Sequence, residues 1–157
     1  MRLEFLWIGK TKDASLARLE KRYLDRIRRF YPASASAVSE QSRKDVHQKD
    51  AAERREAELV LKKLPAQARL VVLDERGAQV TSRGLAGWFK KWTLSALPQV
   101  VFVVGGHAGV PQEVLRRADK VLSLGRMTLP HELARVVLLE QIYRAATIVR
   151  GLPYHNE

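Results

Sequence analysis

Three points where buried strands are predicted to end carry the residues best able to bind a ligand. Residues 69–74 (RLVVLD) run into a turn at Gly77, residues 99–104 (QVVFVV) open into the glycine loop 105–109 (GGHAG), and residues 120–124 (KVLSL) lead into the loop 124–129 (LGRMTL). Ligands of open α/β sheets bind beyond the carboxyl ends of the strands. Glycines there let backbone approach a ligand with no side chain between them. The sequence therefore predicts one socket built from these three segments.

The composition of these segments restricts the ligand. The loop 124–129 is apolar and small, which suits a flat aromatic ring better than a triphosphate. The chain has no G-x-G-x-x-G, no phosphate loop, no H-E-x-x-H and no G-x-S-x-G. These absences argue against dinucleotide, triphosphate, zinc and serine-hydrolase sites, and no metal is expected. Considered one at a time, each segment has a simpler explanation. The glycine loop 105–109 could be an ordinary strand-to-helix turn, and the loop 124–129 could be packed into the core without binding anything.

The last seven residues, GLPYHNE, place Tyr154 and His155 almost at the end of the chain. One interpretation is a short tail that packs its tyrosine. The other is a tail that brings a stacking ring and a proton acceptor to a site, since imidazole with a pKa of about 6.5 accepts protons near neutral pH.

Strands and helices are predicted to alternate along the chain. This pattern indicates an α/β fold with a mostly parallel sheet flanked by helices, in a single domain over residues 1–157. Strands are expected over 2–9, 33–39, 69–74, 99–104 and 120–124, and helices over 15–31, 51–64, 81–92, 111–118 and 131–149.

The predicted helix 131–149 is apolar around most of its circumference. Such a helix must be covered on more than one side. The sheet provides one cover, and the pattern favours a second copy of the protein as the other. The alternative is a monomer whose own N-terminal helices cover it. Glu140 and Arg144 are expected to form an i,i+4 pair.

The charge of the chain indicates a polyanionic partner. Its net charge is +11, with +6 in residues 1–65 and +5 in residues 66–157, so the excess is not confined to a tail. Candidates for RNA contact are Arg22, Arg26, Arg29, Lys90 and Lys91. The absence of cysteine excludes disulfides and thiolate chemistry. No apolar run is long enough for a signal peptide or a membrane span, so a cytoplasmic location is expected.

Four motifs together resemble a known family over essentially the whole chain. They are Leu73–Asp74 followed by Gly77, the G-G-x-x-G at 105–109, TLPHxLxR at 128–135, and PYH at 153–155. In this combination the chain resembles the SPOUT-superfamily methyltransferases that modify N3 of a pseudouridine in bacterial large-subunit ribosomal RNA. Departures are Ala78 where a lysine is common, His107 at a variable place in the loop, and Asn156 after the PYH motif.

The resemblance implies a dimer, a C-terminal trefoil knot and S-adenosylmethionine as cofactor. Carried over, the catalytic residues are His155, Tyr154 and Arg135, with the last residues of the chain at the mouth of the socket. His155 would accept the N3 proton, Tyr154 would stack on the base or hydrogen-bond it, and Arg135 would neutralise a phosphate or an oxyanion. The cofactor contacts fall on Leu73, Gly105, Leu124, Gly125, Arg126, Met127, Thr128 and Leu129.

Two other classes of protein fit the sequence less well. A non-enzymatic RNA-binding module explains the charge but gives the glycine loop and the terminal PYH no purpose. A nicotinamide-dependent enzyme lacks its glycine fingerprint.

Overall fold

A computed structural model describes residues 1–41 and 48–154 of the chain. Its core is a five-stranded sheet in which every pairing is parallel, with the strand order β2-β1-β4-β3-β5. The strands are β1 (Arg2–Ile8), β2 (Ala33–Val38), β3 (Arg69–Gln79), β4 (Gln99–Val104) and β5 (Lys120–Ser123). The helices are α1 (Ala14–Ile27), α2 (Lys49–Lys62), α3 (Ser82–Leu94), α4 (Gln112–Arg117) and α5 (His131–Val149).

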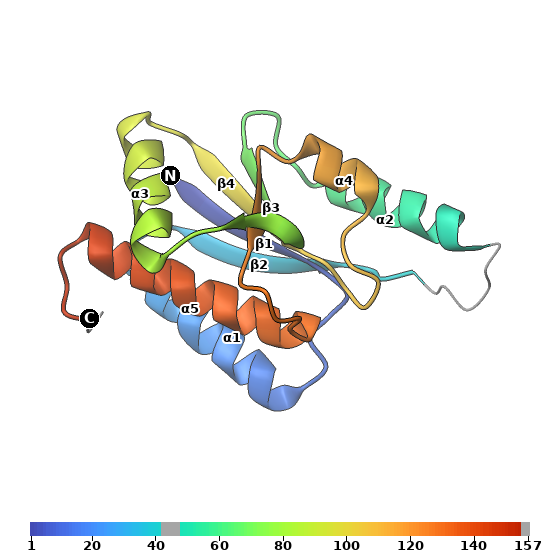
Figure 1. Ribbon diagram of the computed structural model, residues 1–157, viewed down its shortest axis with the longest axis horizontal. Coiled ribbons are helices and arrows are strands. Elements are labelled where there is room, and N and C mark those ends of the chain that lie inside the picture. The colour runs from blue at the N-terminus through green and yellow to red at the C-terminus, as the bar shows by residue number, and fades with distance from the viewer. Residues whose placement is uncertain (42–47, 155–157) are drawn as a thin grey trace.

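Helices cover both faces of the sheet (Figure 1). Helices α1, α3 and α5 pack on one face, where the fully buried ring of Phe102 lies 5.6 Å from that of Phe5 and 6.4 Å from that of Phe89. Helices α2 and α4 cover the other face. Because β1 and β4 are buried on both sides, they are continuous apolar runs, as strands of a parallel sheet usually are. This confirms the predicted fold class.

Strand β3 is five residues longer than predicted. Its pairing with β5 is interrupted after Leu73 and resumes at Ala78, and both of these residues align with Leu122. A side chain at Gly77 would come within 2.7 Å of the backbone of Val121 and Leu122. Residues 74–77 therefore leave the ladder and return to it, and only glycine fits where the two strands cross so closely.

Helix α5 is covered mainly by α1 and α3 of the same chain. Leu138, Leu139 and Ile142 are fully buried, whereas Tyr143, Ile148 and Val149 are only partly covered. The chain's own helices thus supply much of the cover that the sequence assigned to a second copy. None of the helices in the described part of the chain combines the length and apolar character needed to cross a bilayer.

Candidate functional site

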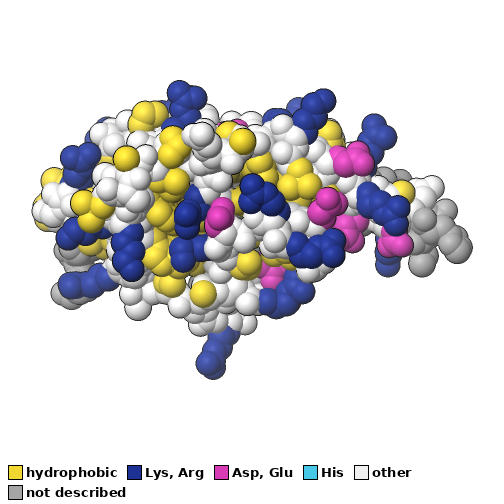
Figure 2. Space-filling view, turned by 90° about the horizontal axis from the view of Figure 1, so that it is seen from above, with side chains coloured by type: hydrophobic (Ala, Val, Ile, Leu, Met, Phe, Trp, Pro, Cys, Tyr) yellow, Lys and Arg dark blue, Asp and Glu magenta, His cyan; other side chains and the backbone are white. Residues whose placement is uncertain are grey.

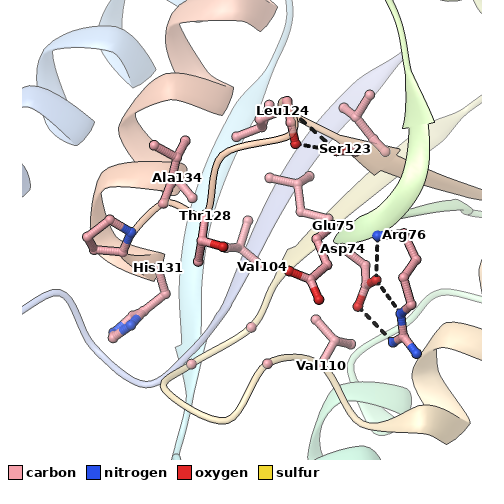
Figure 3. A pocket seen from close by; sticks show the side chains of 18 of the residues that line it. Asp74, Glu75, Arg76, Val104, Val110, Ser123, Leu124, Thr128, His131 and Ala134 are labelled. Atoms are coloured by element: carbon pink, nitrogen blue, oxygen red, sulfur yellow. Dashed lines mark hydrogen bonds and ion pairs between the residues drawn. The ribbon is translucent and has the colours of Figure 1, made fainter.

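The three predicted strand ends line one cavity of about 800 Å³. Leu73 comes from β3, Val104 ends β4 and is followed by the glycine loop, and the loop after β5 closes the cavity from the other side (Figure 3). The first turn of α5 completes the wall with His131 and Ala134. The topology explains this meeting, since β4, β3 and β5 are neighbours and their carboxyl ends share one edge of the sheet.

The glycine loop has a shape that side chains would prevent. Gly106 pairs with Gly109 in an isolated bridge, with the Gly109 amide donating to the Gly106 carbonyl at 3.1 Å. A Cβ on Gly105 would lie 2.4 Å from the Gly109 carbonyl group, and Gly109 has φ +82°. This tight turn keeps the loop backbone against the cavity.

Glu40 holds the outer side of the same loop. Its carboxylate accepts a hydrogen bond from the His107 backbone amide at 2.6 Å. The carboxylate also occupies the space that a side chain on Gly106 would need, only 2.4 Å away. Glu40 follows β2, and nothing in the sequence marked it, because the contact spans 67 residues. It fixes the glycine loop from outside the cavity.

Two acidic residues stand at the β3 side of the cavity. Asp74 is paired with Arg76 at 2.8 Å, and hydrogen bonds from Arg76 hold the pKa of the Asp74 carboxyl below its usual range. Glu75 is exposed and also lines the cavity. The lining thus combines the apolar side chains of Leu73, Val104 and Leu129 with polar groups on the β3 side.

Most residues predicted to contact the cofactor line this cavity. They are Leu73, Gly105, Leu124, Gly125, Met127, Thr128 and Leu129. Arg126 is the exception, because it is exposed and does not line the cavity. Met127 is 85% exposed, so its side chain is free to cover a ligand.

Arg135 does not line the cavity. It is fully buried and donates to the Ile8 carbonyl at 2.8 Å and to the Thr11 hydroxyl at 2.9 Å. Its guanidinium lies 5.6 Å from the centre of the Trp7 ring, and burial lowers its pKa. A guanidinium enclosed in this way has no free path to an RNA phosphate. The structure therefore places Arg135 as a tie between α5 and the end of β1, in place of the predicted contact with substrate.

Tyr154 lies away from the cavity in the same chain. Its ring packs edge-on against Tyr143 at 4.6 Å, its hydroxyl donates to Glu140 at 3.3 Å, and Arg144 stands over the ring at 4.9 Å. Glu140 is nine residues beyond His131, or about 14 Å along the helix axis. Within one chain, then, Tyr154 does not reach the mouth of the socket as predicted. His155 lies outside the described residues.

Burial, together with a hydrogen bond to Tyr23 and the charge of Glu140, raises the pKa of Tyr154 to about 12. The phenol is therefore protonated at neutral pH. Glu140 and Arg144 form the predicted i,i+4 pair at 2.6 Å.

His131 is a cavity residue that was not among the predicted site residues. It is the first residue of α5, and burial and the charge of Arg135 lower its pKa. Its position inside the TLPHxLxR motif was the available signal. In the described part of the chain no three His, Asp or Glu residues gather as a metal site would require.

Comparison with known proteins assigns this arrangement to a family. The family model described as predicted SPOUT methyltransferase matches residues 1–155. The chain belongs to the SPOUT methyltransferase family. A protein of Geobacter metallireducens named ribosomal RNA large subunit methyltransferase H is 45% identical over 156 residues, which cover 99% of each chain. The protein of the same name from Geobacter sulfurreducens is 41% identical, over 99% of this chain and 100% of its own.

Solved structures agree on the fold. A probable methyltransferase from Bordetella pertussis superposes with a TM-score of 0.57 at 13% identity, over 92% of this chain and 96% of the other. A probable methylase family protein from Haemophilus influenzae gives 0.56 at 14% identity, over 99% of this chain and 70% of the other. SPOUT membership implies the predicted C-terminal knot.

SPOUT methyltransferases use S-adenosylmethionine, and the cavity fits this cofactor. A space of about 800 Å³ is within the range of small-molecule sites. A Cβ at Gly105 would clash with the Gly109 backbone, so the tight loop beside the cavity requires glycine there. The apolar strand ends suit an adenine ring, and the carboxylates of Asp74 and Glu75 suit hydroxyl and cationic groups.

Proposed function

We propose that the chain is an S-adenosylmethionine-dependent methyltransferase that methylates N3 of a pseudouridine in bacterial large-subunit ribosomal RNA. The observation that carries the proposal is the meeting of the three strand ends in one cavity. The names of the full-length relatives support large-subunit ribosomal RNA as the substrate. The place of work is then the cytoplasm, where ribosomes are found.

The surface charge supports an RNA substrate. Lys and Arg side chains are spread across the face shown in Figure 2, whereas the Asp and Glu side chains gather toward the end where α2 and α4 lie. On α1, a hollow of about 410 Å³ is lined by Arg18, Lys21, Arg22, Asp25, Arg26 and Arg29. Three of the predicted RNA contacts are in this group, and the other two, Lys90 and Lys91, are exposed on α3. Such charges bind RNA phosphates by counterion release.

When bound, S-adenosylmethionine supplies a methyl group on a positively charged sulfur. The chain's task is to hold the cofactor at the strand ends and to bring the base nitrogen into line with that methyl carbon. The glycine loop and the loop 124–129 hold the cofactor. Aligning the base requires groups at the cavity mouth that position it and accept the N3 proton.

We propose further that these groups include the tail of a second copy of the chain. Tyr154 packs on the far half of α5, so one chain's tail does not serve its own cavity. The same face of α1 and α5 carries the partly covered rings of Tyr23, Phe30 and Tyr143, together with Leu19, which is 36% exposed. A homodimer through this face would cover these rings and bring Tyr154 and His155 of one copy to the cavity of the other.

Mass spectrometry of ribosomal RNA after incubation with the protein and labelled cofactor tests the activity. We expect one added methyl group on a pseudouridine of the large-subunit RNA. Calorimetry with S-adenosylmethionine separates an enzyme from a plain RNA-binding module, which would give no heat. RNA that stays unlabelled, with no heat of binding, would overturn the proposal.

Mixing two inactive variants tests the shared site. Gly105→Val disrupts the glycine loop of the cavity, because its side chain would clash with the Gly109 backbone, and Tyr154→Ala with His155→Ala disables the tail. If one copy's tail serves the other's cavity, half of the dimers in an equal mixture contain one working site, and about a quarter of wild-type activity returns. An equal mixture that stays inactive, after refolding together, contradicts the shared site.

A further inference from the structure

We infer that His131, in the wall of the cavity itself, is the catalytic residue that takes the N3 proton of the base. This inference rests on the proposed function and names the proton acceptor within it. The acceptor predicted from the sequence was His155, which belongs to the tail.

The position of His131 is the first argument. It is the first residue of α5 and lines the same cavity as Leu73 and Gly105. Figure 3 shows its ring beside the glycine loop, at the end of the cavity opposite Asp74 and Arg76. About a third of its side chain is exposed (32%), so a base at the mouth has access to the imidazole.

The charges around His131 favour the neutral imidazole that can accept a proton. Burial and Arg135 lower its pKa, with a smaller contribution from His107, whereas Glu132 and Glu40 act in the opposite direction. Glu132 Oε1 lies 3.9 Å from His131 Nε2, at the limit of an ion pair, but both carboxylates are also engaged by backbone amides. Glu132 accepts hydrogen bonds from the backbone amides of Lys12 and Asp13 at 3.0 Å each, and Glu40 accepts from the amide of His107. The amino end of α5 adds a positive dipole that further disfavours the imidazolium.

The other titratable groups of the cavity are less suited. A general base works best when its pKa is near the operating pH, and carboxylic acids in general titrate near pH 4. Asp74 is also engaged by Arg76. His107 is exposed in the bend of the glycine loop. His107 lines the cavity too, but it belongs to the exposed loop, whereas His131 is partly buried at the start of a helix.

The transfer step balances with His131 as acceptor. The N3–H bond breaks and the proton goes to the imidazole, which becomes imidazolium. The electron pair left on N3 forms the new bond to the methyl carbon, and the bond between that carbon and sulfur breaks with its electrons remaining on sulfur. The imidazolium then releases its proton to water before the next turnover.

Single-turnover methylation of ribosomes, measured from pH 5 to 9, tests the assignment with three matched variants: His131→Asn, His155→Asn and His107→Asn. Wild-type enzyme should lose rate at acidic pH. His131→Asn should lower the rate at pH 8 by 10² to 10⁴-fold and abolish the acidic limb, because general bases contribute about that much. Cofactor affinity, measured by calorimetry, should change less than about threefold. His155→Asn and His107→Asn should keep the acidic limb.

Other outcomes would overturn the assignment of His131. A His131→Asn enzyme with a near wild-type rate, or an acidic limb lost only in His155→Asn, overturns the assignment. If asparagine weakens cofactor binding, His131→Gln replaces it. Independently, ¹⁵N NMR of the wild-type histidines should show His131 titrating below pH 6.5, and titration above pH 7 would contradict the inference. A wild-type enzyme that methylates nothing defeats the proposed function instead.

Discussion

The two halves of α5 have different surroundings. Its N-terminal part is tied to the end of β1 and to the segment before α1. Glu132 accepts hydrogen bonds from the amides of Lys12 and Asp13, and Arg135 donates to the Ile8 carbonyl. Its second half carries an aromatic group with Tyr143 and Tyr154 against α1, held by contacts at the surface. Figure 1 shows these regions at opposite ends of the helix.

The difference separates two tasks. The first half is a rigid wall, built from buried hydrogen bonds that connect residues more than 100 positions apart in the chain. The second half is a partly covered surface on which the tail rests. A cofactor socket requires fixed geometry, whereas a surface with uncovered rings suits contact with another molecule. Matched substitutions in the two halves should therefore have different consequences.

The largest difference is expected between Gly105→Ala in the cavity and Gly151→Ala after α5. A methyl group at position 105 meets the Gly109 backbone at 2.4 Å, so the loop must open. We expect cofactor affinity to fall at least about 100-fold, or 2.7 kcal/mol. Gly151 has φ +65° but open space around it, so alanine there should cost only about 1 kcal/mol of stability and leave affinity unchanged. Calorimetry measures the cofactor affinity of both variants, and equal affinities would contradict the difference between the cavity end and the tail end of α5.

The two arginines of α5 make the second comparison. Arg135→Gln leaves the buried Ile8 carbonyl without its charged donor, and we expect the free energy of unfolding to fall by about 2–3 kcal/mol. Arg144→Gln removes a partly exposed i,i+4 pair with Glu140, worth about 0.5 kcal/mol or less. Urea unfolding curves of both variants give the values. Similar losses would mean that the two ends of the helix are held equally.

The socket was predictable from the sequence, because it depends on local signals. Apolar runs ending in Asp74, Gly105 and Leu124 identify strand ends, and a parallel sheet brings such ends to one edge. The strand β4 and the helix α5 were predicted with their observed bounds. The polar stretch 74–79 was not recognised as strand, since it is held by a second pairing with β5 and not by its own pattern.

The surroundings of Arg135 and Tyr154 were not predictable in the same way. An arginine within a helix gives no sign that it will be buried against Trp7 and Ile8, because those residues lie more than 120 positions earlier. The family motif marked Arg135 and Tyr154 as important without showing whether each touches substrate, structure or a second copy. Glu40 carried no motif at all.

The smallest effect is expected on the pH dependence of stability, through Glu20 of α1, which supports the wall of the cavity. Its carboxylate accepts hydrogen bonds from the Trp7 indole and the Thr11 hydroxyl, and burial raises its pKa. The folded protein therefore keeps this proton to a higher pH than the unfolded chain does, so stability decreases as pH rises through that interval. Glu20→Gln keeps an acceptor oxygen and has no charge, so this decrease should disappear.

Glu132→Gln should have the opposite effect. Backbone hydrogen bonds lower the pKa of Glu132, so its contribution to stability is lost as pH falls. Urea unfolding of both variants between pH 3 and 8 measures the two slopes, and changes of the same sign would contradict this account of the wall.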